Sequence, residues 1–397
     1  MMKSILLGMT LIPGLLGARD FDVKTAEELR VRDGLPNFFA KLERGGDVRI
    51  AYLGGSITKA EGWRVKTLAH FRSAHTNANI VEINAAISGT GSTYGACRLQ
   101  DHVIQHKPDL VFVEFRVNNG DLKSMEGIVR QLWMSNPETD ICFVYTINES
   151  MVAALSDGKN VSFGSTMEAV ANRYGIPTID FGLEVVRQVK DGTLIFKGDK
   201  EPAGQRIFAE DGTHPGDEGH DIYRDVVVRS FDAMRGKGTA GPHGLPEPID
   251  AGSWTRARQV PLDTAVFSGE WFPVDIASDP VIARGGVRSL KMFPAAVKTS
   301  TKGAALTIRF NGTTAGFIDI PGTEETTLAA VIDGRAPVEI LRKETFNPEQ
   351  KMGRFFFIPE QAPGEHTVRF EIKRLPDNLS YYVGPILVVG DILPVDK

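Results

Sequence analysis

The sequence predicts an α/β domain with a doubly wound parallel sheet, followed by a smaller all-β domain. Three observations support this division. From about residue 45 to residue 235, short β-branched runs alternate with longer amphipathic stretches, as strands alternate with helices in α/β proteins. Residues 236–253 are rich in glycine and proline. After them helical periodicity nearly vanishes, and alternating runs separated by turns indicate a β-sandwich or jelly roll.

The predicted strands of the α/β domain are five mostly apolar runs, residues 48–53, 80–85, 110–115, 141–147 and 177–180. Four of them are apolar on consecutive residues, which suits strands that are buried on both faces of a sheet. The stretches between and after them predict helices over residues 63–74, 94–106, 124–136, 167–174, 183–189 and 217–234. Ligands of such sheets bind beyond the carboxyl ends of the strands.

The predicted strands of the second domain are residues 305–310, 315–320, 328–332, 354–358, 367–372 and 386–389. We therefore divide the chain into an α/β domain over residues 19–235, a linker over residues 236–253 and a β domain over residues 254–397. A chain of 397 residues is long enough for two domains, each with its own core. The sequence leaves open whether the β domain binds glycan, shapes the cleft or only stabilises the fold.

The first 18 residues are typical of a secretory signal peptide. Residues 4–17 follow a lysine and are apolar apart from Ser4 and Thr10, and Ala18 is the last residue that would be removed. This stretch is too short to span a bilayer, and no later stretch reaches the roughly 18 apolar residues that a membrane helix needs. We therefore expect a secreted or periplasmic protein. The alternative is an apolar N-terminal segment that packs on the domain.

Composition and charge exclude several classes of function. The chain is 42% hydrophobic and 24% charged, with a net charge of −5, and it has no dense basic stripe that would indicate a nucleic-acid partner. Cys97 and Cys142 are the only cysteines, too few for a disulfide framework, and no cysteine or histidine spacing indicates zinc. His102 and His106 share a helix face but lack a third ligand. We expect neither a metal nor a cofactor.

Two short motifs together contain a serine and the two side chains that could activate its hydroxyl as a nucleophile. Ser56 lies in Gly54-Gly55-Ser56-Ile57-Thr58, directly after the first predicted strand, and Asp211 precedes His214 by three residues. A serine hydroxyl is a poor nucleophile near neutral pH unless an imidazole accepts its proton and a carboxylate orients that imidazole. Asn118 follows the third predicted strand, so it is expected at the same edge of the sheet as Ser56.

Four sequence blocks, in this order, resemble those of the SGNH (GDSL-like) hydrolase superfamily. They are residues 54–58, 84–92, 115–119 and 211–215. The resemblance implies a flavodoxin-like sheet that carries an ester hydrolase, and residues 48–119 look most like carbohydrate esterases of polysaccharide-degrading bacteria. It further implies that Ser56 is the nucleophile, His214 the general base and Asp211 its orienting acid. It assigns the oxyanion hole to the backbone N–H groups of Ser56 and Gly89 and to the side-chain amide of Asn118.

The third block departs from the superfamily pattern. Arg116 stands where a glycine is commonest, and Asn119 stands where an aspartate is commonest. Arg116 is expected either to bind an anionic sugar such as a uronate or to pair with a local acid such as Glu114. Trp63 and Tyr94, which lie near or between the blocks, either stack on a sugar or pack in the core.

The sequence thus predicts a serine esterase that removes ester groups, O-acetyl groups first of all, from a polysaccharide or oligosaccharide through an acyl-serine intermediate. Asp217 and His220 repeat the Asp-x-x-His spacing at the start of the last predicted helix, but Asp211 and His214 are favoured. One alternative is a uronate methyl-esterase, which Arg116 would suit. Another is a catalytically inactive carbohydrate-binding protein, against which the intact Ser56, Asp211 and His214 argue.

Overall fold

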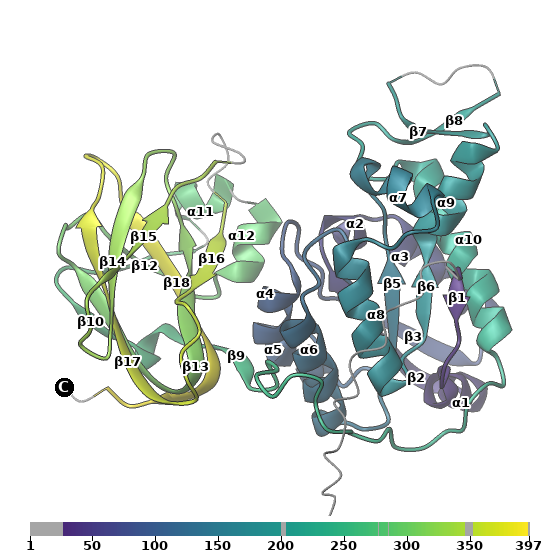
Figure 1. Cartoon of the computed structure of the whole chain (residues 1–397), viewed down its shortest axis with the longest axis horizontal. Helices are drawn as coiled ribbons and strands as arrows, with labels where there is room; N and C mark the ends of the chain where they lie inside the picture. Colours follow the sequence, from purple (N-terminus) through teal and green to yellow (C-terminus); the bar gives the residue numbers. More distant parts are fainter. Residues whose placement is uncertain (1–26, 200–203, 277, 285, 346–351, 396–397) are drawn as a thin grey trace, which may run out of the picture.

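The computed structural model describes residues 27–199, 204–276, 278–284, 286–345 and 352–395 (Figure 1). The predicted signal peptide, residues 1–18, lies outside the described residues. An α/β domain and an antiparallel β domain lie side by side, with the β domain at the left in Figure 1. In the described ranges, no helix is long and apolar enough to cross a membrane.

The main sheet of the α/β domain has the strand order β1-β6-β5-β4-β2-β3. Its strands are β1 (Leu29–Arg30), β2 (Gly46–Gly54), β3 (Ala78–Asn84), β4 (Leu110–Glu114), β5 (Asp140–Tyr145) and β6 (Thr178–Asp180). All pairs are parallel except that of β1 with β6. The parallel part has the flavodoxin-like order, which confirms the predicted fold class. Its topological switch point lies between β2 and β4, where ligands bind in such sheets.

Helices cover both faces of this sheet, because successive strand residues point to opposite faces and both sets are apolar and buried. One face packs against α1 (Pro36–Arg44), α3 (Trp63–Ala74), α9 (Phe181–Lys190) and α10 (Asp217–Met234). The other packs against α4 (Ser92–Cys97), α5 (Leu99–His102), α6 (Leu122–Ser135) and α8 (Ser162–Tyr174). The shorter elements are α2 (Ser56–Lys59), α7 (Val152–Ser156), the 3₁₀ turns Ile104–His106 and Glu149–Met151, and the parallel pair β7 (Leu194–Lys197) and β8 (Arg206–Ala209).

One predicted helix, residues 94–106, is divided into three pieces, α4, α5 and a 3₁₀ turn. The first break is at Arg98, which is fully buried. Its guanidinium donates to the carbonyl of Ala85, just after the end of β3. The second break is at Val103, whose backbone leaves the helical region. An amphipathic pattern alone does not show that a buried arginine will tie this turn to a strand end.

The β domain is built of antiparallel strands, which confirms the all-β prediction for most of it. The strands are β9 (Ala257–Val260), β10 (Val266–Ser268), β11 (Phe272–Pro273), β12 (Val297–Thr299), β13 (Ala305–Ile320), β14 (Thr326–Ile332), β15 (Val338–Arg342), β16 (Arg354–Phe357), β17 (Gly364–Arg374) and β18 (Tyr381–Leu393). Two predicted strands are joined in β13, which passes a register shift between Gly312 and Thr314. The domain also holds a 3₁₀ turn (Leu262–Thr264) and two helices that were not predicted, α11 (Pro280–Arg284) and α12 (Gly286–Met292).

The two domains share one continuous apolar core. It joins Ile87 and Tyr94 of the α/β domain to Ile282 and Phe293 of the β domain. The ring of Tyr94 also stacks on Phe355 of β16, with ring centroids 5.1 Å apart. Each domain also has an apolar cluster of its own, as expected, and the shared cluster joins the two domains at their interface.

Residues 236–253 contain no helix or strand and are fastened to the α/β domain (Figure 1). The ring of His243 stacks on Trp133 at 4.6 Å, and its Nε2 atom is 2.8 Å from a carboxylate oxygen of Asp140. The backbone N–H of Ile249 donates to Glu126 at 2.6 Å. The glycine- and proline-rich segment thus packs along the surface of the α/β domain.

Candidate active site

The predicted nucleophile, Ser56, is the first residue of α2 and directly follows the turn that leaves β2. A Cβ atom on Gly55 would lie 2.0 Å from the side-chain oxygen of Asn118. A Cβ atom on Gly54 would lie 2.9 Å from the side chain of Thr58. Both distances are too short for a real side chain, so the close approach of β2, α2 and the loop after β4 requires glycine at both positions.

A buried carboxylate, that of Glu114, is hydrogen-bonded to the turn that carries Ser56. It is fully buried at the end of β4 and accepts hydrogen bonds from the hydroxyls of Thr58 (3.0 Å) and Thr146 (2.6 Å) and from the backbone N–H of Gly55. Burial raises the pKa of Glu114, against the opposing effect of these hydrogen bonds and of Arg116. Sequence reasoning missed this role, although an acid at the end of an apolar strand was a visible signal.

We expect Glu114→Ala to lower the free energy of unfolding by about 2–4 kcal/mol, because it leaves a cavity and three unpaired donors. The turnover number should fall as well, because the turn that carries Ser56 loses its anchor. Urea unfolding and steady-state kinetics with an aryl acetate measure the two effects.

The matched control is Glu339→Ala, which removes an exposed acid of the β domain. It should change the free energy of unfolding by less than about 0.5 kcal/mol. If Glu114→Ala proves as stable and as active as this control, Glu114 does not hold the turn.

The loop after β8 brings Asp211 and His214 to Ser56. One carboxylate oxygen of Asp211 accepts the backbone N–H groups of Thr213 and His214, both at 2.8 Å. The other lies 2.6 Å from Nδ1 of His214, and Nε2 of His214 lies 2.8 Å from Oγ of Ser56. The three side chains are thus linked by a continuous chain of hydrogen bonds, Asp211–His214–Ser56. With the proton on Nδ1, the imidazole can accept the proton of the serine hydroxyl.

The electrostatics keep Asp211 ionised. Partial desolvation raises the pKa of its carboxyl group, but the hydrogen bonds from the side chain and backbone of His214 and from Thr213 outweigh it and lower the pKa to about 2. The side chains of Asp211 and His214 are 55% and 51% exposed, so this chain of hydrogen bonds lies open to solvent. A bulky substrate can reach such a site without passing through a tunnel.

The two further residues that the resemblance assigns to the oxyanion hole lie at the same edge. The side-chain amide of Asn118 lies over the nucleophile turn at Gly55. Gly89, in the loop after β3, has a φ of +65°, which favours glycine. The loop is tied to the turn by the backbone bond from Ile87 to the carbonyl of Gly54 at 3.0 Å. A Cβ atom on Gly91 would lie 2.4 Å from the carbonyl oxygen of Asn118, so the two loops also touch.

The second Asp-x-x-His pair takes no part in this arrangement. His220 is 6% exposed, and its Nδ1 atom accepts the backbone N–H of Trp63 at 3.1 Å. Burial, with a contribution from the charge of Lys66, lowers the pKa of His220 to about 4, so it is neutral near pH 7. Asp217 forms an ion pair with Lys66 at 2.7 Å. This pair fixes α10 against α3.

The prediction that Arg116 contacts an anionic sugar is wrong. Arg116 is paired with an acid, as the alternative expected, but that acid is Asp180 and not Glu114. Arg116 is fully buried and makes a bidentate ion pair with Asp180, at 2.6 and 2.8 Å. It also donates to the backbone carbonyls of Tyr145 and Thr146. Arg116 thus ties together the carboxyl ends of β4, β5 and β6.

The aromatic residues proposed for sugar stacking are also enclosed. Trp63 and Tyr94 are both 0% exposed, so neither ring can reach a sugar in this conformation. Trp63 packs among the rings of the core, and the hydroxyl of Tyr94 donates to Gln259 of the β domain at 3.1 Å. Asn119 is exposed, with a φ of +66°, and its carbonyl accepts the hydroxyl of Ser92 at 2.9 Å. Of the four proposed substrate contacts, Asn119 alone remains accessible.

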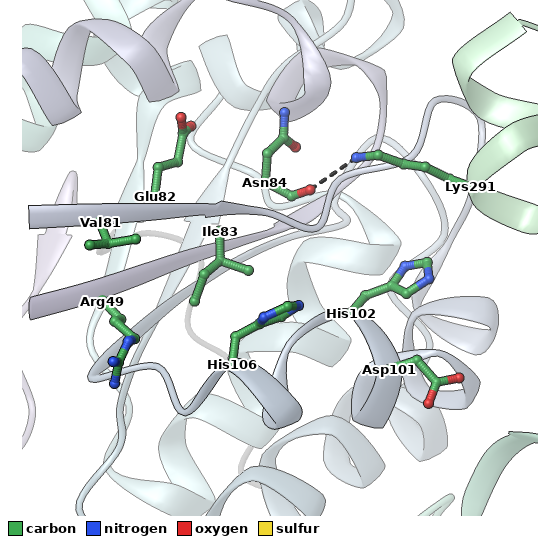
Figure 2. A pocket seen from close by; sticks show the side chains of 9 residues that line it. All are labelled: Arg49, Val81, Glu82, Ile83, Asn84, Asp101, His102, His106 and Lys291. Carbon is green, nitrogen blue, oxygen red and sulfur yellow. Dashed lines mark hydrogen bonds between the residues drawn. The ribbon is translucent and has the colours of Figure 1, made fainter.

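A hollow of about 440 Å³ lies elsewhere, along the edge strand β3, and His102 and His106 line it (Figure 2). None of the residues of the Asp211–His214–Ser56 chain lines it. The described residues contain no group of three or more histidine, cysteine, aspartate or glutamate side chains that could hold a metal ion.

Comparisons with known proteins agree with this geometry. Residues 52–222 match the model of the GDSL-like Lipase/Acylhydrolase family. A search of curated proteins finds no match. The solved structure of a two-domain esterase (CEX) active on acetylated mannans has a TM-score of 0.75 at 18% identity, over 93% of this chain and 98% of that one. The structure of such an esterase with mannopentaose gives 0.70 at 19% identity, over 90% and 94%.

The solved structures show that the two-domain fold is shared over 90% to 93% of this chain. The family match begins within β2 and ends within α10, so it contains all four sequence blocks. Over residues 52–222, the α/β domain is therefore similar to the GDSL-like Lipase/Acylhydrolase family.

Proposed function

We propose that this protein removes O-acetyl groups from a polysaccharide or oligosaccharide, with Ser56 as the nucleophile. The observation that carries the proposal is the continuous chain of hydrogen bonds from Asp211 through His214 to Oγ of Ser56. The contact of 2.8 Å between Oγ of Ser56 and Nε2 of His214 is within the range over which a proton is transferred between a hydroxyl and an imidazole. The contact of 2.6 Å between Asp211 and Nδ1 of His214 orients the imidazole.

In the proposed mechanism, His214 accepts the hydroxyl proton as Oγ of Ser56 attacks the ester carbonyl carbon. The carbonyl oxygen becomes negatively charged and is stabilised by the backbone N–H groups of Ser56 and Gly89 and the amide of Asn118. The C–O bond to the sugar then breaks, and His214 returns the proton to the sugar oxygen. Water, activated by His214 in the same way, releases acetate from acetyl-Ser56.

Two features favour a carbohydrate ester as the substrate. The exposed Asp211 and His214 suit the approach of a long, hydrophilic chain. The two-domain esterase that shares this fold over 93% of the chain acts on acetylated mannans, which makes acetylated mannan the first polymer to test. The uronate methyl-esterase alternative loses its support, because Arg116 is buried in its pair with Asp180.

The test is to incubate the protein with acetylated mannan, acetylated xylan, and acetylated and methylated pectin, and to identify the released group by mass spectrometry. We expect acetate, and none with the Ser56→Ala variant. Release of methanol alone would support the methyl-esterase. If wild type and Ser56→Ala are equally inert on every polymer and on an aryl acetate while still binding glycan, the protein is a carbohydrate-binding protein.

A further inference from the structure

An arginine of the β domain lies against the residue that we assign to the oxyanion hole. α12 packs beside the loop that follows β3, and a Cβ atom on Gly89 would lie 2.6 Å from the Nη1 atom of Arg288. Arg288 as a whole residue is 8% exposed, so its guanidinium is largely enclosed. The absence of a side chain at Gly89 is what admits it.

The guanidinium of Arg288 has unused hydrogen-bonding capacity. Its Nη2 atom donates to the carbonyl of Gly353 at 2.7 Å, whereas its Nε atom is buried without a partner. The nearby acid Glu344 is engaged by Arg354 in a bidentate pair, at 2.6 and 2.8 Å. Burial and the charge of Arg354 lower the pKa of Arg288 to about 10, so it remains a cation near pH 7.

A second cation on the same helix fixes this position. Lys291 lies one turn after Arg288, and its Nζ atom donates to the carbonyls of Asn84 (2.9 Å) and Ala86 (3.3 Å). Figure 2 shows the Lys291 side chain reaching from the helix of the β domain to the end of β3. Lys291 therefore holds α12 against the loop that carries Gly89, while Arg288 makes no such bond to it among the described contacts.

This loop belongs to the active site through its contacts with the nucleophile turn. Ile87 bonds to Gly54, two residues before Ser56, and Gly91 packs on the backbone of Asn118. Arg288 consequently borders the site from the side of the β domain. A buried cation whose donors are not all paired is costly, and an oxygen of a bound ligand would offset that cost.

We infer that Arg288 is a substrate-binding residue of the esterase site and donates a hydrogen bond to an oxygen of the sugar unit that carries the ester. The inference rests on the proposed function. A sugar unit offers hydroxyl and ring oxygens as acceptors beside the ester, whereas a small aryl acetate has no sugar hydroxyl or ring oxygen. Arg288 therefore favours carbohydrate esters over small activated esters, and the β domain supplies part of the specificity.

The experiment compares two substrates in wild type, Arg288→Ala and Arg288→Lys. One is 4-nitrophenyl acetate, and the other is a set of oligosaccharides from the acetylated polymer that wild type deacetylates best. We expect kcat/KM of Arg288→Ala to fall about 10- to 100-fold more on the oligosaccharides than on 4-nitrophenyl acetate, the range for a lost hydrogen bond to a charged group. Arg288→Lys keeps the charge, so its additional loss of kcat/KM on the oligosaccharides should be smaller than that of Arg288→Ala.

The matched control is Arg335→Ala, an arginine of the same domain that is 61% exposed and pairs with Asp333. It should leave the ratio of the two activities unchanged. Equal losses of Arg288→Ala on both substrates, or no loss on either, would overturn the inference. Thermal unfolding of each variant identifies a loss that comes from misfolding alone. If wild type deacetylates no polysaccharide, the proposed function fails, and that result is distinct from an unchanged ratio.

Discussion

The variants Ser56→Ala and His214→Ala are expected to lose about 10⁴- to 10⁶-fold in kcat towards an aryl acetate. Without Oγ there is no nucleophile, and without the imidazole no group takes its proton at 2.8 Å. Because the two residues act as one unit, the double variant should be barely slower than either single variant. Steady-state kinetics with the three proteins measures this directly.

Stability separates this loss from unfolding. The His214 side chain is 51% exposed, so its removal leaves no cavity and should shift the thermal midpoint little. A folded His214→Ala protein with more than a tenth of the wild-type rate would show that another base activates Ser56. Equally, a Ser56→Ala protein that keeps its activity would show that another residue is the nucleophile.

The variant Asp211→Asn is expected to lose about 10²- to 10⁴-fold in kcat. The asparagine oxygen can still accept the backbone N–H groups of Thr213 and His214, so the loop is preserved. Its NH₂ group, however, would face Nδ1 of His214 and force the proton onto Nε2, the atom that must accept from Ser56. The loss in kcat should be smaller than in an enzyme whose Ser-His-Asp triad is buried, because solvent reaches Asp211.

The pH profile adds a second check on Asp211. Its pKa is lowered to about 2, below the unfolded value of 3.8. The stabilising contacts of its carboxylate are therefore fully present above pH 3.8 and are lost as the pH falls through about 2. Titration of Asp211 should not contribute to the pH–rate profile above pH 4.

The control for this variant is Asp217→Asn, in the second Asp-x-x-His pair. Asp217 is 84% exposed and contacts Lys66, so its replacement should change kcat by less than about twofold. If the two variants are equally active, the assignment of Asp211 as the orienting acid is wrong.

The sequence was sufficient for those parts of the site that come from local patterns. Ser56 follows an apolar strand, and the strand order of a doubly wound sheet places Asn118 at the same edge, so their proximity could be predicted. The pairing of Asp211 with His214 needs only a spacing of three residues. The remaining chemistry depends on packing between distant segments, on which a local pattern carries no information.

Arg116, Trp63 and Arg288 illustrate this limit. Arg116 and Trp63 lie near the sequence blocks, but packing encloses both, and the partner of Arg116 is Asp180 on another strand. Arg288 lies far from every block, on a helix of the β domain that the alternating pattern did not predict. That α12 reaches the loop of Gly89 follows from the packing of the two domains and from the hydrogen bonds of Lys291.

The most direct test of the account is to treat the protein with a serine-directed 4-nitrophenyl phosphonate and locate the adduct by peptide mass spectrometry. We predict one adduct per chain, on Oγ of Ser56, which blocks esterase activity and forms far more slowly in His214→Ala. An adduct on another serine that abolishes activity, with Ser56 unmodified, would contradict the account.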